Sequence, residues 1–375
     1  MLPDDTRVVS ADDHVVEHPR LWLDRLPLRY REAAPQVDRG ADGRDVWLFE
    51  GEPVADFGLD VVAGKDPRDI DLAPRGYADM RPGCHDIAER IRDMDADGVW
   101  AQLCFPTFAG AAGTTFSRAR DPELAAACVR AYNDFVLDEW CDYAPDRQIP
   151  LVLVPFWDVP AAVAEVERTA ALGARSVSLL EAPHRLGLPS YGTGHWDPLL
   201  RACEEAELPV SMNLGSCGAP QGVARDADAF VSIALFGVGS VMACVELLMS
   251  PVFHRFAGLR VVLSEAGIGW IPYVLERTDY SWERHRFWSG VDADRRPSEL
   301  FRDHVYGCFT SDQAGIDQRY AIGVDQILFA GDYPHADSNW PHTRKVLGEQ
   351  LVDVPDDEAR LIAAGNARRL FRFAA

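Results

Sequence analysis

The chain has 375 residues, of which 59 are Asp or Glu and 37 are Lys or Arg, so its formal net charge is −22. A nucleic-acid surface needs clustered basic side chains, and a strongly negative chain without a basic stripe argues against one. The length suits one (β/α)8 barrel with insertions, or two smaller domains. The composition therefore excludes nucleic acid as a partner and leaves one or two domains.

The cysteines and the amino terminus bear on the cellular compartment. The eight cysteines are scattered and form no CxxC pair, so neither a thiolate zinc site nor a disulfide framework is indicated. The first residues, MLPDDTRVV, lack the basic and apolar regions of a signal peptide, and no apolar run approaches the roughly 18 residues of a membrane span. We expect reduced, mostly buried thiols in a cytoplasmic protein that has no membrane partner.

The first predicted strand begins at Val8 and runs into the acidic and histidine residues of RVVSADDHVVE, residues 7–17. Residues 36–80 look like an insertion, because a predicted β-hairpin around 46–49 is followed by a stretch rich in Gly, Pro and Asp. Such a segment suits a flap over a barrel mouth, and a plain surface excursion is the alternative.

From residue 86 onward, predicted helix-then-strand units repeat. Helical spacing or capping residues indicate helices at 86–98, from 121, at 158–173, from 197, at 227–249 and at 356–371. Apolar runs indicate strands at 99–105, 149–156, 176–180, 208–213, 259–264, 305–310 and 327–330. Glu246 and several glycines interrupt the apolar tract 227–249, so we interpret it as a barrel helix and not a membrane segment.

Eight strands that alternate with helices predict an α/β fold with a parallel sheet closed into a (β/α)8 TIM barrel. The prediction is a single domain, 1–375, with the inserted hairpin or flap after strand 1. A doubly wound open sheet is the alternative, but no Gly-rich phosphate fingerprint opens the first helix.

Residues just past the strand ends of such a barrel share one cavity. These positions are rich in groups that bind divalent metals, and the predicted ligands are Asp12, His14, Glu181, Glu265, Asp332 and His335. Without a metal, such carboxylates would repel one another and raise each other's pKa. The alternative is that several are helix N-caps. Weaker candidates are Glu17, which could orient His14, His195, which could be a packed loop residue, and Asn213.

Several stretches resemble one family along nearly the whole chain. They are SADDHVVEHP, GHWDPLLRACEEAELPV, RFAGLRVVLSEAGIGWIPYVLERTD, GDYPH and GNARRLF. Together they resemble the amidohydrolase-2 branch of the metal-dependent amidohydrolase superfamily. The resemblance implies a barrel that binds zinc or a similar ion through a strand-one His-x-His, a strand-five His and a strand-eight Asp. It also implies that the metal activates water or assists decarboxylation.

Two positions depart from that family pattern. Asp12 replaces the first His, and Asn213 stands where the strand-five His is expected. Carboxylate-rich ligation suits iron better than zinc. The sequence is similar to the TIM-barrel diiron monooxygenases of this superfamily, typified by the enzyme that hydroxylates the platensimycin and platencin diterpenoid scaffold. This resemblance implies two Fe ions, dioxygen and a bulky, terpenoid-like substrate linked to coenzyme A, in antibiotic biosynthesis.

Three functions remain open from the sequence. The main hypothesis is an oxidoreductase, a diiron monooxygenase, because four carboxylates would balance the charge of two ferrous ions. The alternative is a metal-dependent hydrolase or decarboxylase with one Zn ion. The third is a barrel that binds a small molecule without catalysis. A homo-oligomer is left open.

Overall fold

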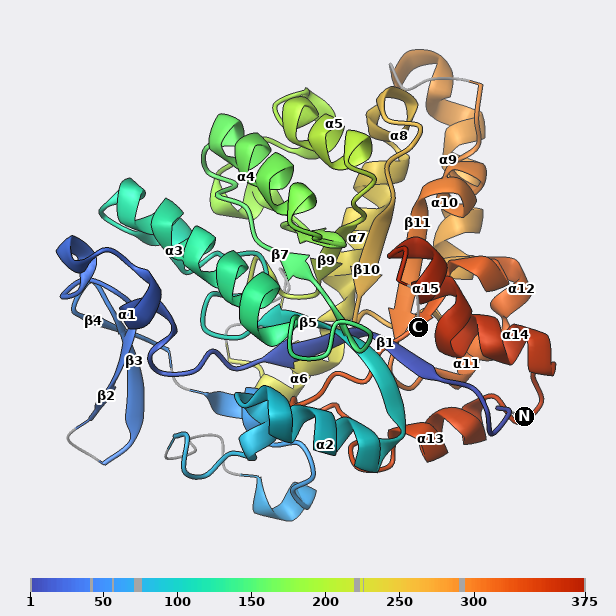
Figure 1. The fold of residues 1–375 in the computed structure, drawn as a ribbon. Coiled ribbons are helices and arrows are strands. Elements are labelled where there is room, and N and C mark those ends of the chain that lie inside the picture. Colours follow the sequence, from blue (N-terminus) through green and yellow to red (C-terminus); the bar gives the residue numbers. More distant parts are fainter. Residues whose placement is uncertain are drawn as a thin grey trace.

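The computed structural model describes residues 2–40, 43–55, 57–70, 76–218, 223–224, 226–289 and 294–373. Parallel strands form its centre (Figure 1), in a three-stranded sheet of order β1-β5-β6 and a six-stranded sheet of order β12-β11-β10-β9-β8-β7. The bounds are β1 Val8–Val15, β5 Val99–Pro106, β6 Gln148–Ile149, β7 Leu151–Val152, β8 Ser176–Ser178, β9 Val210–Asn213, β10 Val261–Ser264, β11 Val305–Phe309 and β12 Ile327–Phe329. Pro150, which has no N–H to donate to a ladder, separates β6 from β7.

The segment after β12 lies against β1. The Asp332 N–H donates to the Asp12 carbonyl at 2.9 Å, and the His14 N–H donates to the Tyr333 carbonyl at 2.7 Å. A Cβ at Gly331 would lie 2.8 Å from Asp13 Oδ1, so this approach of the two segments requires glycine. The result is an α/β fold in which the strands follow chain order and the first and last strands lie side by side.

Helices surround these strands (Figure 1). Their bounds are α1 Leu21–Arg25, α2 Ile87–Asp97, α3 Pro122–Phe135, α4 Val159–Ala171, α5 Asp197–Glu205, α6 Ala229–Leu235, α7 Gly237–Leu248, α8 Val252–Arg255, α9 Ile271–Ser289, α10 Pro297–His304, α11 Gln313–Asp317, α12 Arg319–Ile322, α13 Thr343–Gln350, α14 Asp356–Arg360 and α15 Asn366–Leu370. Asp86, Asp121 and Asp158 cap α2, α3 and α4 by accepting backbone N–H groups. These caps explain why the helix starts were visible in the sequence.

The apolar tract 227–249 forms α6 and α7, with Phe236 between them. By length and composition alone, Phe230–Leu248 could cross a membrane, since its mean hydropathy is 2.1, and 28% of that window is buried. In the fold, α7 packs against α8, α9 and α10. The tract therefore contributes a helix to the outer layer, as the sequence interpretation expects.

The insertion contains the antiparallel sheet β2-β3-β4, at Gln36–Arg39, Asp45–Phe49 and Glu52–Ala55. This sheet stands at one end of the molecule, near α1 and α3 (Figure 1). The Trp47 ring stacks on Phe108 at 4.4 Å between centroids and meets the edge of Trp22, so the hairpin packs into an aromatic core. Residues 41–42, 56 and 71–75 of the predicted insertion lie outside the described residues.

Arg90, on α2, is fully buried and joins β1 to its surroundings. Its guanidinium donates to the carbonyls of Gly83 at 2.6 Å and His14 at 2.5 Å, and to Gln102 Oε1 at 3.2 Å. Removing it would leave buried carbonyl groups without donors.

We expect Arg90→Met to lower the free energy of unfolding by about 3–5 kcal/mol, because the carbonyls that it satisfies stay buried. The matched control is Arg92→Met on the same helix, where the exposed guanidinium pairs only with Glu89 and should contribute less than about 0.5 kcal/mol. Urea denaturation of both variants checks this. Equal losses would contradict the assigned role of Arg90.

Candidate metal centre

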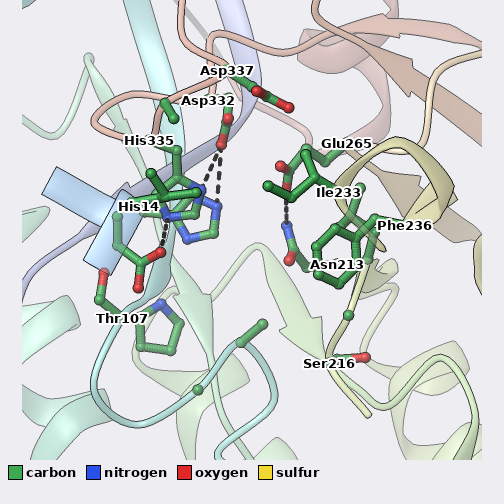
Figure 2. Close-up of a pocket in the computed structure, with 18 of the residues that line it drawn as sticks. His14, Thr107, Asn213, Ser216, Ile233, Phe236, Glu265, Asp332, His335 and Asp337 are labelled. Carbon is green, nitrogen blue, oxygen red and sulfur yellow. Dashed lines mark hydrogen bonds and ion pairs between the residues drawn. The ribbon is translucent and has the colours of Figure 1, made fainter. Parts of the chain in front are cut away.

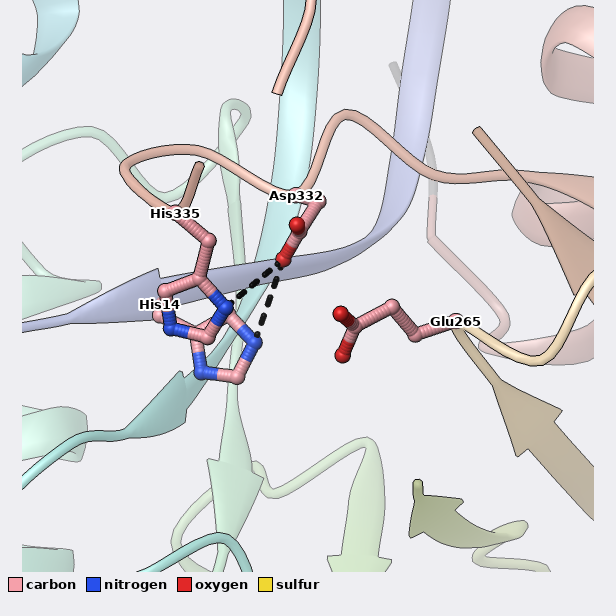
Figure 3. Close-up of side chains that lie close together, drawn as sticks. All are labelled: His14, Glu265, Asp332 and His335. Carbon is pink, nitrogen blue, oxygen red and sulfur yellow. Dashed lines mark ion pairs between the residues drawn. The ribbon is translucent and has the colours of Figure 1, made fainter. Parts of the chain in front are cut away.

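Four side chains come together just past the strand ends: His14 from β1, Glu265 directly after β10, and Asp332 and His335 from the segment after β12. One potential ligand atom from each lies within 4.8 Å of the others. Figure 3 shows the carboxylates of Asp332 and Glu265 facing the two imidazoles. Parallel strands whose carboxyl ends meet at one end of the fold account for this gathering.

The contacts within the cluster are close. Asp332 Oδ1 lies 3.0 Å from His335 Nδ1 and 3.5 Å from His14 Nε2 (Figure 3). The two imidazole rings stack, with centroids 3.7 Å apart and planes inclined by 26°. The side chains therefore point to a shared volume, where one ion could contact several of them.

The backbone is strained at both carboxylates. Glu265 has φ +64° and Asp332 has φ +54°, in the left-handed region that favours glycine. Such conformations persist where the surrounding structure holds them, and they gather at functional sites. The strain supports a functional role for both residues.

Two buried polar atoms here have no hydrogen-bond partner among the described residues. They are His14 Nε2 and Asp332 Oδ2, whereas Asp332 Oδ1 meets only the imidazoles of His14 and His335. Buried polar atoms are almost always satisfied, so orphaned ones at one place require an explanation. Imidazole nitrogens and carboxylate oxygens are ligands for manganese, iron and other divalent ions. The donor set therefore fits a divalent metal ion.

Burial and mutual repulsion act on the protonation of these groups. Burial, followed by the charge of Asp332, raises the pKa of Glu265 to about 8. Burial also lowers the His335 pKa, but the carboxylates of Asp332, Asp60 and Glu265 together outweigh it, and the pKa rises to about 10. For His14, burial and then the charge of His335 hold the pKa well below its usual value. A proton on His335 thus balances part of the carboxylate charge, and a metal ion that binds there would displace this proton, because only neutral imidazole is a ligand.

Asp12 and Asn213 lie beside the cluster. Asp12 Oδ1 is 3.6 Å from His14 Nε2, and burial, with the charge of Glu265, raises the Asp12 pKa well above its usual value. Asn213 Nδ2 lies between two carboxylates, 3.2 Å from Asp12 Oδ2 and 3.2 Å from Glu265 Oε2. The amide donates to both carboxylates and so relieves part of their repulsion. An imidazole at this position would instead be a further competitor among the metal ligands.

A cavity of about 490 Å³ opens over the cluster. Figure 2 shows His14, Asp332 and His335 on one side of it and Asn213 and Phe236 on the other. Its wall combines apolar side chains with hydroxyl groups, among them Leu59, Pro106, Thr107, Thr114, Leu214, Ser216, Ile233 and Phe236. This volume and lining suit a small, largely apolar ligand with polar substituents.

The structure does not bring the remaining candidates into the cluster. Glu181 lies apart from it, where one carboxylate oxygen accepts the Gly215 N–H at 3.2 Å. Glu17 accepts the N–H groups of Phe108 at 2.8 Å and Ala109 at 3.0 Å, so it holds the loop after β5. His195 is exposed and meets the edge of the Trp196 ring at 5.0 Å.

Some cavity residues carried no signal in the sequence. Ile233 and Phe236 come from the apolar tract, where helical spacing alone did not tell which residues face a cavity. Leu59 and Asp60 reach the cavity from the insertion, while among the described residues none from β2-β4 lines it. Asp337 lies two residues after His335, and this proximity to GDYPH was the one available hint.

The fold is that of an amidohydrolase-type α/β protein. The Amidohydro_2 family model, described as amidohydrolase, matches residues 18–373, so the chain belongs to this amidohydrolase family.

Relatives and solved structures agree with this family. The chain is 24% identical over 310 residues to the gamma-resorcylate decarboxylase of Polaromonas sp. strain JS666, covering 80% of this chain and 91% of that protein. It matches an amidohydrolase structure from Mycobacterium avium subsp. paratuberculosis with a TM-score of 0.77 at 23% identity, over 98% of this chain and 100% of that one. It matches 5-carboxyvanillate decarboxylase from Sphingomonas paucimobilis with a TM-score of 0.69 at 22% identity, over 99% and 100%.

These comparisons correct the main functional hypothesis. The expected oxidoreductase, a diiron monooxygenase of terpenoid or antibiotic biosynthesis, is wrong, because the relatives are named decarboxylases. The physical argument for it counted four carboxylates shared between two metals, and Glu181 lies apart from the cluster. The resemblance to the amidohydrolase family holds, and the closer relation to diiron monooxygenases is not supported.

The expected cofactor and partners are also corrected. Two similar structures contain manganese, where two Fe ions were expected. One is a dihydroxybenzoic acid decarboxylase from Polaromonas with 2-nitroresorcinol (TM-score 0.63, 18% identity, 98% and 97% coverage). The other is a 5-carboxyvanillate decarboxylase from Novosphingobium aromaticivorans with 4-hydroxy-3-methoxy-5-nitrobenzoic acid (0.66, 18%, 98% and 96%). Dioxygen and a coenzyme A thioester are wrong as partners, since the relatives are named for decarboxylation of small aromatic acids.

The carboxyl group of Glu17 generates a pH prediction. Burial raises its pKa from an ordinary 4.5 to about 7, despite the two N–H groups that it accepts. The folded state therefore favours the protonated form, and its stabilising effect is lost as the pH rises from about 4.5 through about 7. Glu17→Gln removes this ionisation, so its stability relative to wild type should improve by about 1–3 kcal/mol between about pH 5 and about pH 8. Denaturation curves at both pH values test this, and a constant difference would contradict it.

Proposed function

We propose that this chain is a metal-dependent decarboxylase of a small aromatic carboxylic acid. The observation that carries the proposal is the buried set of unpartnered imidazole and carboxylate atoms at one side of the cavity. Membership of the amidohydrolase family and the names of the decarboxylase relatives support it. Decarboxylation replaces a C–CO₂⁻ bond by a C–H bond, with release of CO₂ and uptake of one proton. It needs no oxidant.

His14, Glu265, Asp332 and His335 would hold one divalent ion, with Asp12 adjacent to them. Manganese is a fitting choice, because mixed imidazole and carboxylate ligands suit it and the similar decarboxylase structures contain it. When bound, the ion supplies positive charge that attracts the substrate's carboxylate and stabilises negative charge as CO₂ leaves.

The cavity wall would position the aromatic ring. Phe236 and Ile233 from the α6 side, with Pro106 after β5, offer apolar surface that excludes water from one side of the ring. The Thr107 and Ser216 hydroxyls, on the same wall, can hydrogen-bond ring substituents. In this way the chain would hold the scissile bond over the ion.

Two finer features of the architecture belong to this proposal. β1 and the segment after β12 would close the strands into a (β/α)8 barrel, supported by the hydrogen bonds of Asp332 and His14 across that junction. The single domain 1–375 would then carry the insertion as a partial flap. Leu59 and Asp60 support the flap, since they line the cavity while the hairpin packs elsewhere.

The reaction is tested with protein that has been chelated and reloaded with manganese. We expect CO₂ release from 2,6-dihydroxybenzoate, the substrate named for a similar Rhizobium enzyme, at the same rate with and without oxygen. In D₂O, the product should carry one deuterium on the carbon that lost CO₂. Absence of CO₂ release from a panel of hydroxybenzoates, with full metal occupancy, would contradict the proposal. Cleavage of amides or esters without CO₂ would favour hydrolysis instead.

Metal content tests the ligand set separately. We expect Asp332→Asn to lower manganese affinity at least tenfold, because the carboxylate contacts both imidazoles and has no further partner among the described residues. Glu181→Gln is the matched control, since this buried carboxylate lies outside the cluster and its loss should leave the affinity within about twofold. Elemental analysis and manganese titration measure both. Asn213→Ala should retain most of the metal. Full occupancy in Asp332→Asn would remove it from the ligand set.

A further inference from the structure

The cavity carries negative charge beyond the metal cluster. Asp60 and Asp337 both line it, from the insertion and from the segment after β12. Asp60 Oδ1 lies 4.0 Å from His335 Nε2. Figure 2 shows Asp337 at the edge of the site, close to Asp332. Two further carboxylates therefore stand at the rim of a site that already contains Glu265 and Asp332.

Asp337 lies two residues after His335, and its side chain is exposed where it lines the cavity. Among the described residues that line the cavity, the basic side chains are His14 and His335, and both belong to the metal cluster. A ligand group that extends from the cluster toward the rim therefore meets acidic, apolar and hydroxyl-bearing surface, without a further basic side chain among the described residues.

We propose that Asp337, at the cavity rim, restricts the substrate to aromatic acids with a single carboxylate and neutral hydroxyl substituents. This inference rests on the proposed function. A first carboxylate would be neutralised at the metal. A second would face the rim, where the described residues offer no cation to pair with, and would be repelled by the Asp337 carboxylate. A phenolic hydroxyl can instead donate a hydrogen bond to a rim carboxylate.

The relatives' substrates fall on both sides of this distinction. 2,6-Dihydroxybenzoate carries one carboxylate and two hydroxyls, whereas 5-carboxyvanillate carries two carboxylates. Overall similarity does not choose between them, because this chain matches decarboxylases of both kinds at 18–26% identity. The negative charge at the cavity rim distinguishes the two classes of substrate and favours acids with one carboxylate.

Two inhibitors seen in similar decarboxylases serve as probes. 2-Nitroresorcinol has a nitro group in place of the reacting carboxylate and carries no carboxylate, whereas 4-hydroxy-3-methoxy-5-nitrobenzoic acid carries a carboxylate in addition to its nitro group. Calorimetric titration of the manganese-loaded protein compares wild type, Asp337→Asn and a matched control, Asp353→Asn. Asp353 is exposed and does not line the cavity, so this control removes the same charge elsewhere.

We expect wild type to bind 2-nitroresorcinol more tightly than the nitrobenzoic acid at low ionic strength. Asp337→Asn should tighten binding of the nitrobenzoic acid by about threefold to tenfold and leave 2-nitroresorcinol within about twofold. Salt should reduce this gain, because the rim charge is exposed to solvent. Asp353→Asn should change neither affinity. The kcat/KM ratio of 2,6-dihydroxybenzoate to 5-carboxyvanillate should fall in Asp337→Asn in parallel.

The outcomes separate the two proposals. Equal or tighter binding of the nitrobenzoic acid by wild type, or an equal gain in Asp353→Asn, would overturn the assigned role of Asp337 and leave the decarboxylase proposal standing. If neither probe binds the loaded protein and neither acid releases CO₂, the decarboxylase proposal fails, and the substrate inference fails with it.

Discussion

The burial of carboxylates beside one another is the constraint on which the site depends. Asp12 and Asp332 are buried and Glu265 is partly buried at one end of the parallel strands, and the loss of solvent raises the pKa of each. Keeping such groups close together without a counter-charge costs free energy. The two imidazoles and the amide of Asn213 offset part of this free energy by contacting the carboxylates, and a divalent cation would offset most of the rest. The carboxylate cluster is unfavourable without a cation and is suited to binding one.

Local backbone structure keeps these groups in place. Gly331 lets the segment after β12 approach β1, and Asp13 accepts the Tyr333 N–H at 2.8 Å, which orients the segment that carries Asp332. Arg90 stabilises the same junction by donating a hydrogen bond to the His14 carbonyl. The residues that position the cluster are thus buried polar groups on neighbouring elements. Their hydrogen bonds fix the orientation of the segments that carry the four side chains.

Sequence reasoning succeeded where the information is local. The two-residue spacing of Asp12 and His14 on a strand, and the GDYPH stretch after another strand, identified residues that the structure does bring together. It failed where the outcome depends on packing across the molecule. Glu181 also follows a strand, yet its carboxylate turns to the Gly215 N–H and not to the cluster. The count of four shared carboxylates included Glu181, and the inference of two irons followed from that count. Helix capping fixed most helix starts, but no local pattern showed that Phe236 would face the cavity.

If this strongly acidic protein acts on an aromatic acid, as proposed, its own negative charge opposes substrate binding. With a net charge of −22, and with carboxylates both in the cluster and at the cavity rim, the site without a metal ion would disfavour an aromatic carboxylate. A divalent cation among His14, Glu265, Asp332 and His335 would offset the local negative charge and give the substrate's carboxylate a partner. Ion and substrate would therefore bind with positive coupling, since each relieves repulsion that the other meets. The carboxylates at the rim would keep their negative charge. The ion would therefore attract one substrate carboxylate at the centre of the site, and the rim would repel a second one.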